Sequence, residues 1–339
     1  MRIVETKACA RIGLLGNPSD GYFGRTISTT IQDFQARVIL YEWPELEIVL
    51  GHPDRGLFNG IDDLVEDVRR NGLYGGLRLI KAAIMVFAEY CRENELPLSS
   101  RNFALRYETE IPRQVGLAGS SAIITATFRA LMDFYSIEIP NELLANLILE
   151  VETKEIGIAA GLQDRVCQVY GGLVFMDFDE AYFQANGHGR YQSLDPGLLP
   201  PLFLAYRENL SQISGIYHSN LQERWRLGDS KVVNAMKAFG DLAEEGKQCL
   251  LERDYDRLAK LIDRNFDIRS GLVELDPSNV EMVHLARRLG ACAKYAGSGG
   301  AIVGICEEDD RFLQLQQEFE RLGCKVIRPK IQEPRSGKD

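Results

Sequence analysis

Residues 111–126 read IPRQVGLAGSSAIITA, and this stretch carries the clearest structural signal in the chain. Two glycines precede Ser120 and Ser121, and the sequence then stays almost entirely apolar, without a helix breaker, as far as Tyr135. The run predicts a buried helix, and the first turn of a helix has unpaired N–H groups and partial positive charge. Glycines let an anion approach that backbone, and serine hydroxyls can bond phosphate oxygens or a hard cation such as Mg2+. We therefore expect a phosphate-binding loop, with a simple serine N-cap after a tight turn as the alternative.

This loop differs from two common catalytic loops. A Walker A loop needs Gly-Lys-[Ser/Thr], whereas the Gly-Lys pairs of this chain are followed by Gln248 and Asp339. The G-x-S-x-G pattern of a nucleophile elbow surrounds neither Ser120 nor Ser121.

The composition of the 339 residues is that of a globular protein with room for two domains. The formal net charge of −10 argues against a broad nucleic-acid surface but not against ATP, because local N–H groups and Mg2+ can hold a polyanion. Seven cysteines and four histidines are scattered without a C-x-x-C pair, so neither a disulfide framework nor a zinc site is expected. No apolar run suits a signal peptide or a membrane span, and we expect a cytoplasmic protein of undefined oligomeric state.

Periodicity and turn residues predict an α+β fold. In the first half, strands are expected at 8–15, 27–41, 46–50, 102–110 and 173–178, a polar loop at 55–72, and helices at 73–91, 122–135 and 141–157. Gly and Pro residues place a domain boundary within 184–201, giving domains of 1–190 and 200–332. In the second half, strands are expected at 202–206, 324–328 and on both sides of a glycine loop within 291–306, helical stretches at 209–251, 254–271, 278–289 and 309–322, and a frayed tail at 334–339.

Two groups of polar residues could carry chemistry. Arg11, Asn17 and Asp20 lie on the first strand and the tight turn after it, where Asp20 could bind hydroxyls and Arg11 could stabilise negative charge. Glu152, on a helix, and Asp164, after a glycine-bounded turn, could meet at one site, with one holding Mg2+ and the other meeting a hydroxyl nucleophile. Each pattern also has an ordinary explanation, namely an Asx turn with a surface arginine, or solvated helix carboxylates.

A second glycine loop reads GSGG at 297–300. It lacks the βαβ context of a dinucleotide fingerprint and fits either a close approach to another element or a flexible turn. In order, the strand and turn at 10–20, the loop at 112–121 and the stretch 294–300, which ends in this loop, resemble the three motifs of the GHMP kinase superfamily. This superfamily includes galactokinases, homoserine kinases and mevalonate kinases.

Within that superfamily the chain looks most like the plant-type glucuronokinases. The finer resemblance rests on GLLGNPSDGYFGRTIS at 13–28 and GIAAGLQDRVCQVYGGLVFMDF at 157–178. The sequence departs from the superfamily in two places. Ala118 stands where many relatives have glycine, and the sugar-side turn reads Gly-Asn-Pro-Ser-Asp rather than the Gly-Glu-His of galactokinases and mevalonate kinases.

The resemblance implies a two-domain fold, with an N-terminal mixed-sheet domain for ATP and sugar and a C-terminal ferredoxin-like α+β domain. It implies an ATP- and Mg2+-dependent sugar-1-kinase that phosphorylates the anomeric hydroxyl of D-glucuronate, giving glucuronate 1-phosphate and ADP. Kinases for another sugar or sugar acid, and a non-catalytic sugar sensor, are the alternatives. Joint retention of Arg11, Glu152 and Asp164 argues against the sensor.

The same resemblance implies roles for single residues. Arg11 acts near the transferred phosphoryl group, Asp164 is a base or an orienting residue, and Ser121 and Glu152 hold the metal. The phosphates contact the loop residues Gly116, Leu117, Ala118, Gly119, Ser120 and Ser121. The resemblance makes Asp20 a ligand of a sugar hydroxyl and packs the 297–300 loop against the active site. From their positions in these two turns we also expect sugar contacts from Asn17, Arg25, Gly297, Ser298 and Gly299.

An arginine would suit the carboxylate of glucuronate, because its planar fork matches carboxylate geometry. Arg25, Arg113 and Arg207 lie near the expected site in the sequence. Arg25 is favoured because it shares the sugar-side turn with Asp20, and the alternative is that all three are surface arginines.

Overall fold

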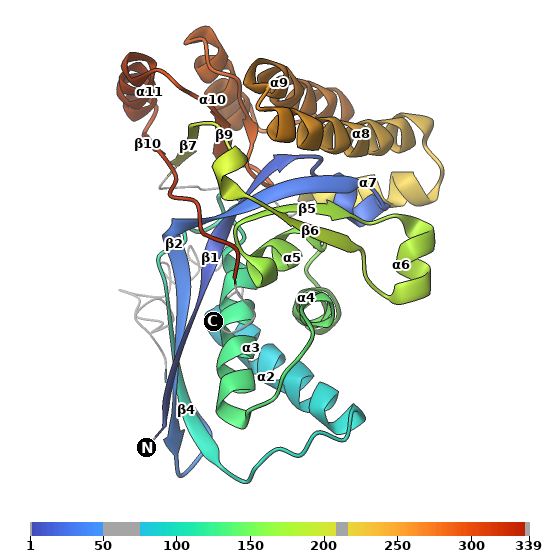
Figure 1. The fold of residues 1–339 in the computed structure, drawn as a ribbon, viewed down its shortest axis with the longest axis vertical. Coiled ribbons are helices and arrows are strands. Elements are labelled where there is room, and N and C mark those ends of the chain that lie inside the picture. Colours follow the sequence, from blue (N-terminus) through green and yellow to red (C-terminus); the bar gives the residue numbers. More distant parts are fainter. Residues whose placement is uncertain (1, 50–74, 208–215, 336–339) are drawn as a thin grey trace, which may run out of the picture.

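The computed structural model describes residues 2–49, 75–207 and 216–335, and Figure 1 shows two sheets, one in each half of the chain, with their helices. The first sheet is built on a long antiparallel pair, β1 (Ile3–Leu15) and β2 (Arg25–Trp43). Its strand order is β3-β4-β2-β5-β6, with β1 also paired to β2. The added strands are β3 (Glu47–Val49), β4 (Asn102–Thr109), β5 (Leu173–Asp177) and β6 (Arg190–Leu194). The sheet is mixed because β3 runs parallel to β4 whereas the other pairs are antiparallel.

The first sheet is covered by the helix that the central sequence stretch predicts. Helix α3 (Gly119–Tyr135) is apolar on nearly every face, and it packs on β1, β2 and α2 (Gly76–Glu93). Ile124, Phe128 and Leu131 of α3 are at most 1% exposed, so burial of apolar surface fixes the position of this helix and of the loop before it. The remaining helices of this half are α4 (Asn141–Glu150), a π-helical turn (Val151–Glu155), α5 (Gln163–Tyr170) and α6 (Glu180–Asn186).

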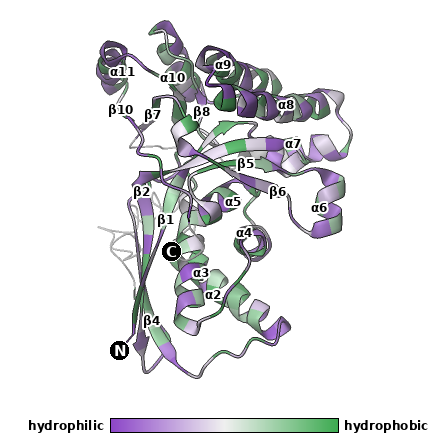
Figure 2. Ribbon diagram, in the orientation of Figure 1, coloured by the Kyte–Doolittle hydropathy of each residue, from purple (hydrophilic) through white to green (hydrophobic). Residues whose placement is uncertain are grey.

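The second sheet is antiparallel, with the order β10-β7-β9-β8. Its strands are β7 (Leu202–Arg207), β8 (Lys294–Tyr295), β9 (Ala301–Ile305) and β10 (Cys324–Ile327). Its helices are α7 (Ile216–Arg226), α8 (Ser230–Glu252), α9 (Tyr255–Leu272), α10 (Pro277–Arg288) and α11 (Asp309–Arg321). In Figure 2 these helices mix hydrophilic and hydrophobic residues, as amphipathic helices do. Helices between β7 and β8, a β8–β9 hairpin and α11 before β10 give the βαββαβ order of a ferredoxin-like domain.

Several local expectations were wrong. The helical stretch expected at 209–251 is divided, in its described part, between α7 and α8, because Asp229 caps a new helix by accepting bonds from the N–H groups of Lys231 and Val232. The helix expected at 141–157 ends its α-helical part at Glu150. The expected boundary region 184–201 contains the end of α6 and the whole of β6, and the division into domains 1–190 and 200–332 stays a prediction.

The described part of the tail that was expected to fray, residues 334–335, is bonded to the first half of the chain. After β10 the chain returns to the first sheet, where the N–H of Arg335 donates to the Tyr170 carbonyl and Ile331 bridges to Ile31. The polar loop expected at 55–72, the start of the helix expected at 73–91, and residues 336–339 lie outside the described residues. No helix in the described part of the chain is long and apolar enough to span a membrane.

Candidate active site

The central loop enters α3 through Ala118, the residue that departs from the glycine pattern. Ala118 has φ 62° and ψ 44°, a left-handed conformation that disfavours a side chain. The two serines after it face different surroundings. Ser120 lines a pocket, whereas Ser121 is fully buried and its hydroxyl donates to the Ala118 carbonyl at 3.2 Å.

The two glycine loops touch each other although they lie far apart in the sequence. A Cβ atom at Gly116, where φ is +72°, would come within 2.7 Å of the Ser298 nitrogen. A Cβ atom at Gly297 would collide with the Gly116 carbonyl. Absence of side chains at both positions is therefore what lets the loop after β8 close on the loop before α3.

Arg11, on β1, is bonded to both glycine loops. Its backbone N–H donates to Leu117 O at 3.1 Å, and its Nη1 donates to Ala296 O at 2.5 Å and Gly116 O at 3.2 Å. The side chain is 5% exposed, so its charge has to be compensated inside the protein. Asp164 supplies that compensation, with its carboxylate 2.6 Å from Arg11 Nη2.

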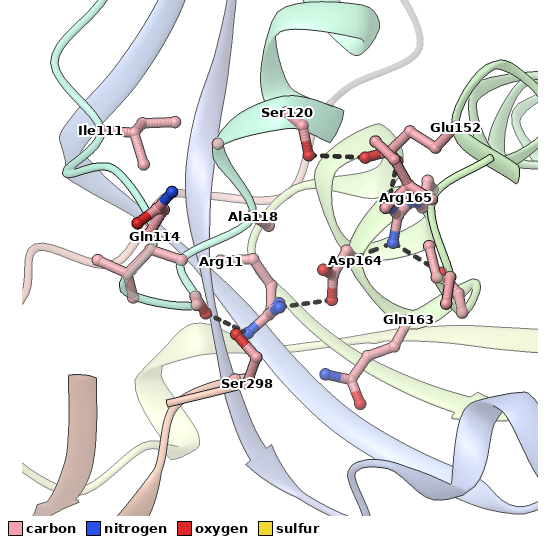
Figure 3. Close-up of a pocket in the computed structure, with 18 of the residues that line it drawn as sticks. Arg11, Ile111, Gln114, Ala118, Ser120, Glu152, Gln163, Asp164, Arg165 and Ser298 are labelled. Carbon is pink, nitrogen blue, oxygen red and sulfur yellow. Dashed lines mark hydrogen bonds and ion pairs between the residues drawn. The ribbon is translucent and has the colours of Figure 1, made fainter. Parts of the chain in front are cut away.

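A chain of charged groups continues from Asp164 to the entrance of α3 (Figure 3). Asp164 lies 3.5 Å from Arg165 Nη1, and Arg165 Nε donates to Glu152 Oε2 at 2.7 Å. The other oxygen of Glu152 accepts a bond from the Ser120 hydroxyl at 2.6 Å. Glu152 and Asp164 therefore meet at one site, as their spacing predicted, and a buried arginine joins them.

The turn after β1 is held by a buried lysine of the second half. Lys294, 1% exposed, donates through Nζ to Asn17 Oδ1 at 2.6 Å and to the carbonyls of Gly13 and Tyr295. Burial, with Arg269 and Arg11 as nearby cations, lowers the pKa of Lys294 well below its ordinary value. These three acceptors satisfy all three N–H groups of the ammonium, so the turn and β8 are fixed to one another.

Asp20 follows in the same turn and faces α5. Its carboxylate accepts a bond from the Gln163 N–H at 3.1 Å. Burial, and secondly repulsion from Asp164, raise the pKa of Asp20 to about 6. An acid of this kind can bind sugar hydroxyls as a donor or as an acceptor, depending on pH.

These groups surround one pocket of about 620 Å3. The residues expected from the sequence that line it are Arg11, Asn17, Asp20, Gly116, Leu117, Ala118, Gly119, Ser120, Glu152, Asp164, Gly297 and Ser298. Ser121, Gly299 and Arg25 are not part of the lining. The Arg25 guanidinium lies 3.5 Å from Asp177 and 3.6 Å from Glu244, so its charge is already balanced outside the pocket.

Four further residues of the site carry no expectation from the sequence: Gln163, Arg165, Arg269 and Lys294. Gln163 and Arg165 flank Asp164 in the motif GLQDR. A basic residue next to an expected active-site acid could have indicated that Arg165 belongs to the site. Lys294 begins the motif-like stretch 294–300, although no role was expected of it. Arg269 had no such signal, because its contacts with the site depend on the packing of the second half against the first.

The donor set fits Mg2+ bound together with ATP. Ser120 Oγ and Glu152 Oε1 are hard oxygen ligands 2.6 Å apart at the pocket wall. The described residues contain no group of three or more His, Cys, Asp and Glu side chains able to hold a metal alone. That suits Mg2+, which is commonly held by one or two protein oxygens plus substrate phosphates and water.

Comparison with known proteins agrees with this geometry. Residues 78–172 match the GHMP kinases N terminal domain, and residues 247–323 match the GHMP kinases C terminal domain. The crystal structure of a Lin0012 protein from Listeria innocua superposes with a TM-score of 0.79 at 17% identity, covering 99% of this chain and all of that one. Lactococcus lactis galactokinase complexed with galactose gives a TM-score of 0.77 at 15% identity, covering 97% and 94%. These structures share the fold.

Two relatives from Arabidopsis thaliana are much more similar in sequence. Glucuronokinase 1 is 48% identical over 333 residues, which cover 96% of this chain and 91% of the relative. Probable glucuronokinase 2 is 46% identical with the same coverage. The chain therefore belongs to the GHMP kinase superfamily, as an ATP-dependent sugar kinase of the glucuronokinase-like type.

Proposed function

We propose that the protein transfers the γ-phosphoryl group of ATP to the anomeric hydroxyl of D-glucuronate. The similarity to the Arabidopsis glucuronokinases supports the acceptor, and the pocket supports the reaction type. The observation that carries the proposal is the pairing of Arg11 with Asp164 beside the phosphate loop. Phosphoryl transfer depends mainly on positioning and charge neutralisation, and this arrangement offers both.

Each group has a part in the reaction. The anomeric oxygen attacks the γ-phosphorus, the bond from that phosphorus to the bridging oxygen of ADP breaks, and the hydroxyl proton passes to the Asp164 carboxylate. Asp164 accepts the hydrogen bond of the hydroxyl and orients its lone pair towards the phosphorus. Arg11 Nη2, which forms an ion pair with Asp164, can also stabilise the negative charge on the oxygens of the transferred phosphoryl group.

The phosphates are bound by the loop before α3. Its N–H groups and the helix N-terminus favour negative charge. Ser120 and Glu152 would hold Mg2+, which would neutralise the phosphate charges when bound. Ser120 takes this part rather than Ser121, whose hydroxyl is already bonded within the helix turn.

A panel of free sugars and uronic acids tests the proposal by ADP release, with phosphorus NMR to locate the new phosphate. We expect rapid turnover with glucuronate and a product phosphorylated at the anomeric oxygen. Preferred turnover of a neutral hexose or of another uronic acid would identify a different sugar kinase. Sugar binding without ADP release by any acceptor would identify a sensor.

A further inference from the structure

Arg269, a partly buried cation in the pocket, has no carboxylate partner among the residues that the structure describes. Seven charged residues line the pocket: the acids are Asp20, Glu152 and Asp164, and the bases are Arg11, Arg113, Arg165 and Arg269. Arg11 and Arg165 form ion pairs with Asp164 and Glu152. None of the ion pairs found within the described ranges includes Arg269, and burial lowers its pKa to about 10.

The neighbours of Arg269 hold it in place without neutralising it. Nη1 donates to Gly297 O at 2.7 Å, Nη2 donates to Ser298 O at 3.1 Å, and the guanidinium lies 5.2 Å from the centre of the Tyr295 ring. Two of its five N–H donors are thus used on carbonyl oxygens, and three remain. A guanidinium fixed in this way is pre-organised to accept a planar anion.

Arg269 lies on the sugar side of the pocket. One helical turn before it on α9, Asn265 accepts a bond from the Gly16 N–H at 2.8 Å and donates to Asn17 O at 3.3 Å. Residues four apart project from the same face of a helix. The face of α9 that carries Arg269 therefore contacts the turn with Asn17, and Arg269 itself contacts the loop with Ser298.

Arg113, the other pocket arginine outside the ion pairs of the described residues, lies elsewhere. Arg113 is exposed and belongs to the loop that leads into α3, between Ile111 and Gln114, where ATP phosphates are expected. Arg207, considered from the sequence, is not part of the lining and donates to Ser278 O at 3.0 Å.

We infer that Arg269 binds the carboxylate of the acceptor sugar and so makes the site selective for a uronic acid over a neutral hexose. This inference rests on the proposed function. The carboxylate replaces water around a guanidinium that has no acid of its own, and a charge-assisted bidentate pair forms. A neutral hydroxymethyl or amide group in the same position leaves the cation unpaired, so the site discriminates against it.

The test compares D-glucuronate with D-glucuronamide, which has nearly the same shape and no charge. Binding of both is measured by calorimetry, and the Michaelis constants for sugar and ATP are measured, for wild type, Arg269→Gln and Arg269→Lys. Arg25→Gln is the control, because it removes a like charge outside the pocket. We expect Arg269→Gln to weaken glucuronate binding about ten- to hundredfold while glucuronamide binding and the Michaelis constant for ATP stay nearly unchanged. The lysine variant should recover part of the preference, and Arg25→Gln should keep all of it.

The outcomes separate the two ideas. If wild type phosphorylates glucuronate and Arg269→Gln keeps the wild-type preference for acid over amide, Arg269 is not the carboxylate ligand although the kinase assignment stands. Equal losses for the acid and the amide would also overturn the inference, because they would assign Arg269 a structural role in the 297–298 loop. If wild type phosphorylates no uronic acid, the proposed function and the inference both fail.

Discussion

Replacing Glu152 with glutamine tests the buried charge pair at the centre of the site. The change keeps the size of a side chain that is 0% exposed and removes its negative charge. Arg165, 4% exposed, then loses its nearest carboxylate and keeps Asp164, at 3.5 Å, and the Gly161 carbonyl among its acceptors. Removing one partner of a buried ion pair costs about 3–5 kcal/mol, and the remaining acid places our expectation near the lower end, about 3 kcal/mol.

The same variant should require more magnesium. A neutral amide oxygen is a weaker ligand for a hard cation than a carboxylate oxygen. The free Mg2+ concentration for half-maximal rate should therefore rise, and turnover at saturating ATP should fall. Urea unfolding without nucleotide measures the stability effect, and initial rates over a magnesium titration measure the functional effect.

Glu155→Gln is the matched control, since Glu155 ends the same π-helical turn three residues later and is exposed. Its free energy of unfolding should change by less than about 0.5 kcal/mol, and its magnesium dependence should stay that of wild type. Equal effects in the two variants would refute the assignment of Glu152 to the site. A Glu152→Gln protein with the wild-type urea midpoint would show that the ion pair with Arg165 does not stabilise the fold.

Three further changes have defined outcomes. Ser120→Ala should lower turnover at limiting Mg2+ by about two decades, and Ser121→Ala should lower it much less; a reversed order in the kinetics would contradict the placement of the hydroxyls. Ala118→Gly should raise the free energy of unfolding by a few tenths to about 1 kcal/mol. Glycine adopts the left-handed conformation of residue 118 without steric strain, and this gain is partly offset by the larger conformational entropy of glycine in the unfolded chain. A lower free energy of unfolding in urea would refute this reasoning. Asp20 has an ordinary pKa of 3.8 and a pKa of about 6 in the folded protein. Between these pH values the folded state binds a proton that the unfolded state has lost, so the free energy of unfolding falls as the pH rises to about 6. Asp20→Asn should therefore gain stability over wild type at pH 7 relative to pH 4, and urea midpoints that shift equally at both pH values would show that its pKa is not raised.

The parts of the site that are encoded locally could be predicted from the sequence. The loop before α3 and the helix itself follow from two glycines, two serines and a long apolar run, all within one stretch. The meeting of Glu152 with Asp164 could also be expected, because only a short return separates them in the sequence. Which of Ser120 and Ser121 faces the pocket could not be predicted from the sequence. It depends on the orientation of the first turn of α3, which the left-handed conformation of Ala118 sets.

The error at Arg25 follows from a contact between distant segments, whereas the errors at β6 and before α8 have local causes. Arg25 shares a turn with Asp20, and nothing in that turn shows that Glu244 of α8 lies 3.6 Å from its guanidinium. Strand β6 was missed because it is polar and mostly exposed, without the alternation that marks a half-buried strand. The break before α8 did have a local signal, since a glycine with positive φ, Gly228, is followed by the N-cap residue Asp229.

Arg11 shows why catalysis and folding are hard to separate at this site. Its guanidinium bonds to Gly116 O in the phosphate loop, to Ala296 O beside β8, and to the carboxylate of Asp164. A substitution that removes this side chain takes away a phosphate-side charge, removes one donor each from the Gly116 and Ala296 carbonyls, and removes an ion-pair partner from Asp164. Lost turnover in such a variant is therefore not evidence for a catalytic part of Arg11 until unfolding measurements show that the two glycine loops remain in contact. Arg269 allows a cleaner experiment, because the charge of the acceptor can be varied in the ligand while the protein is left unchanged.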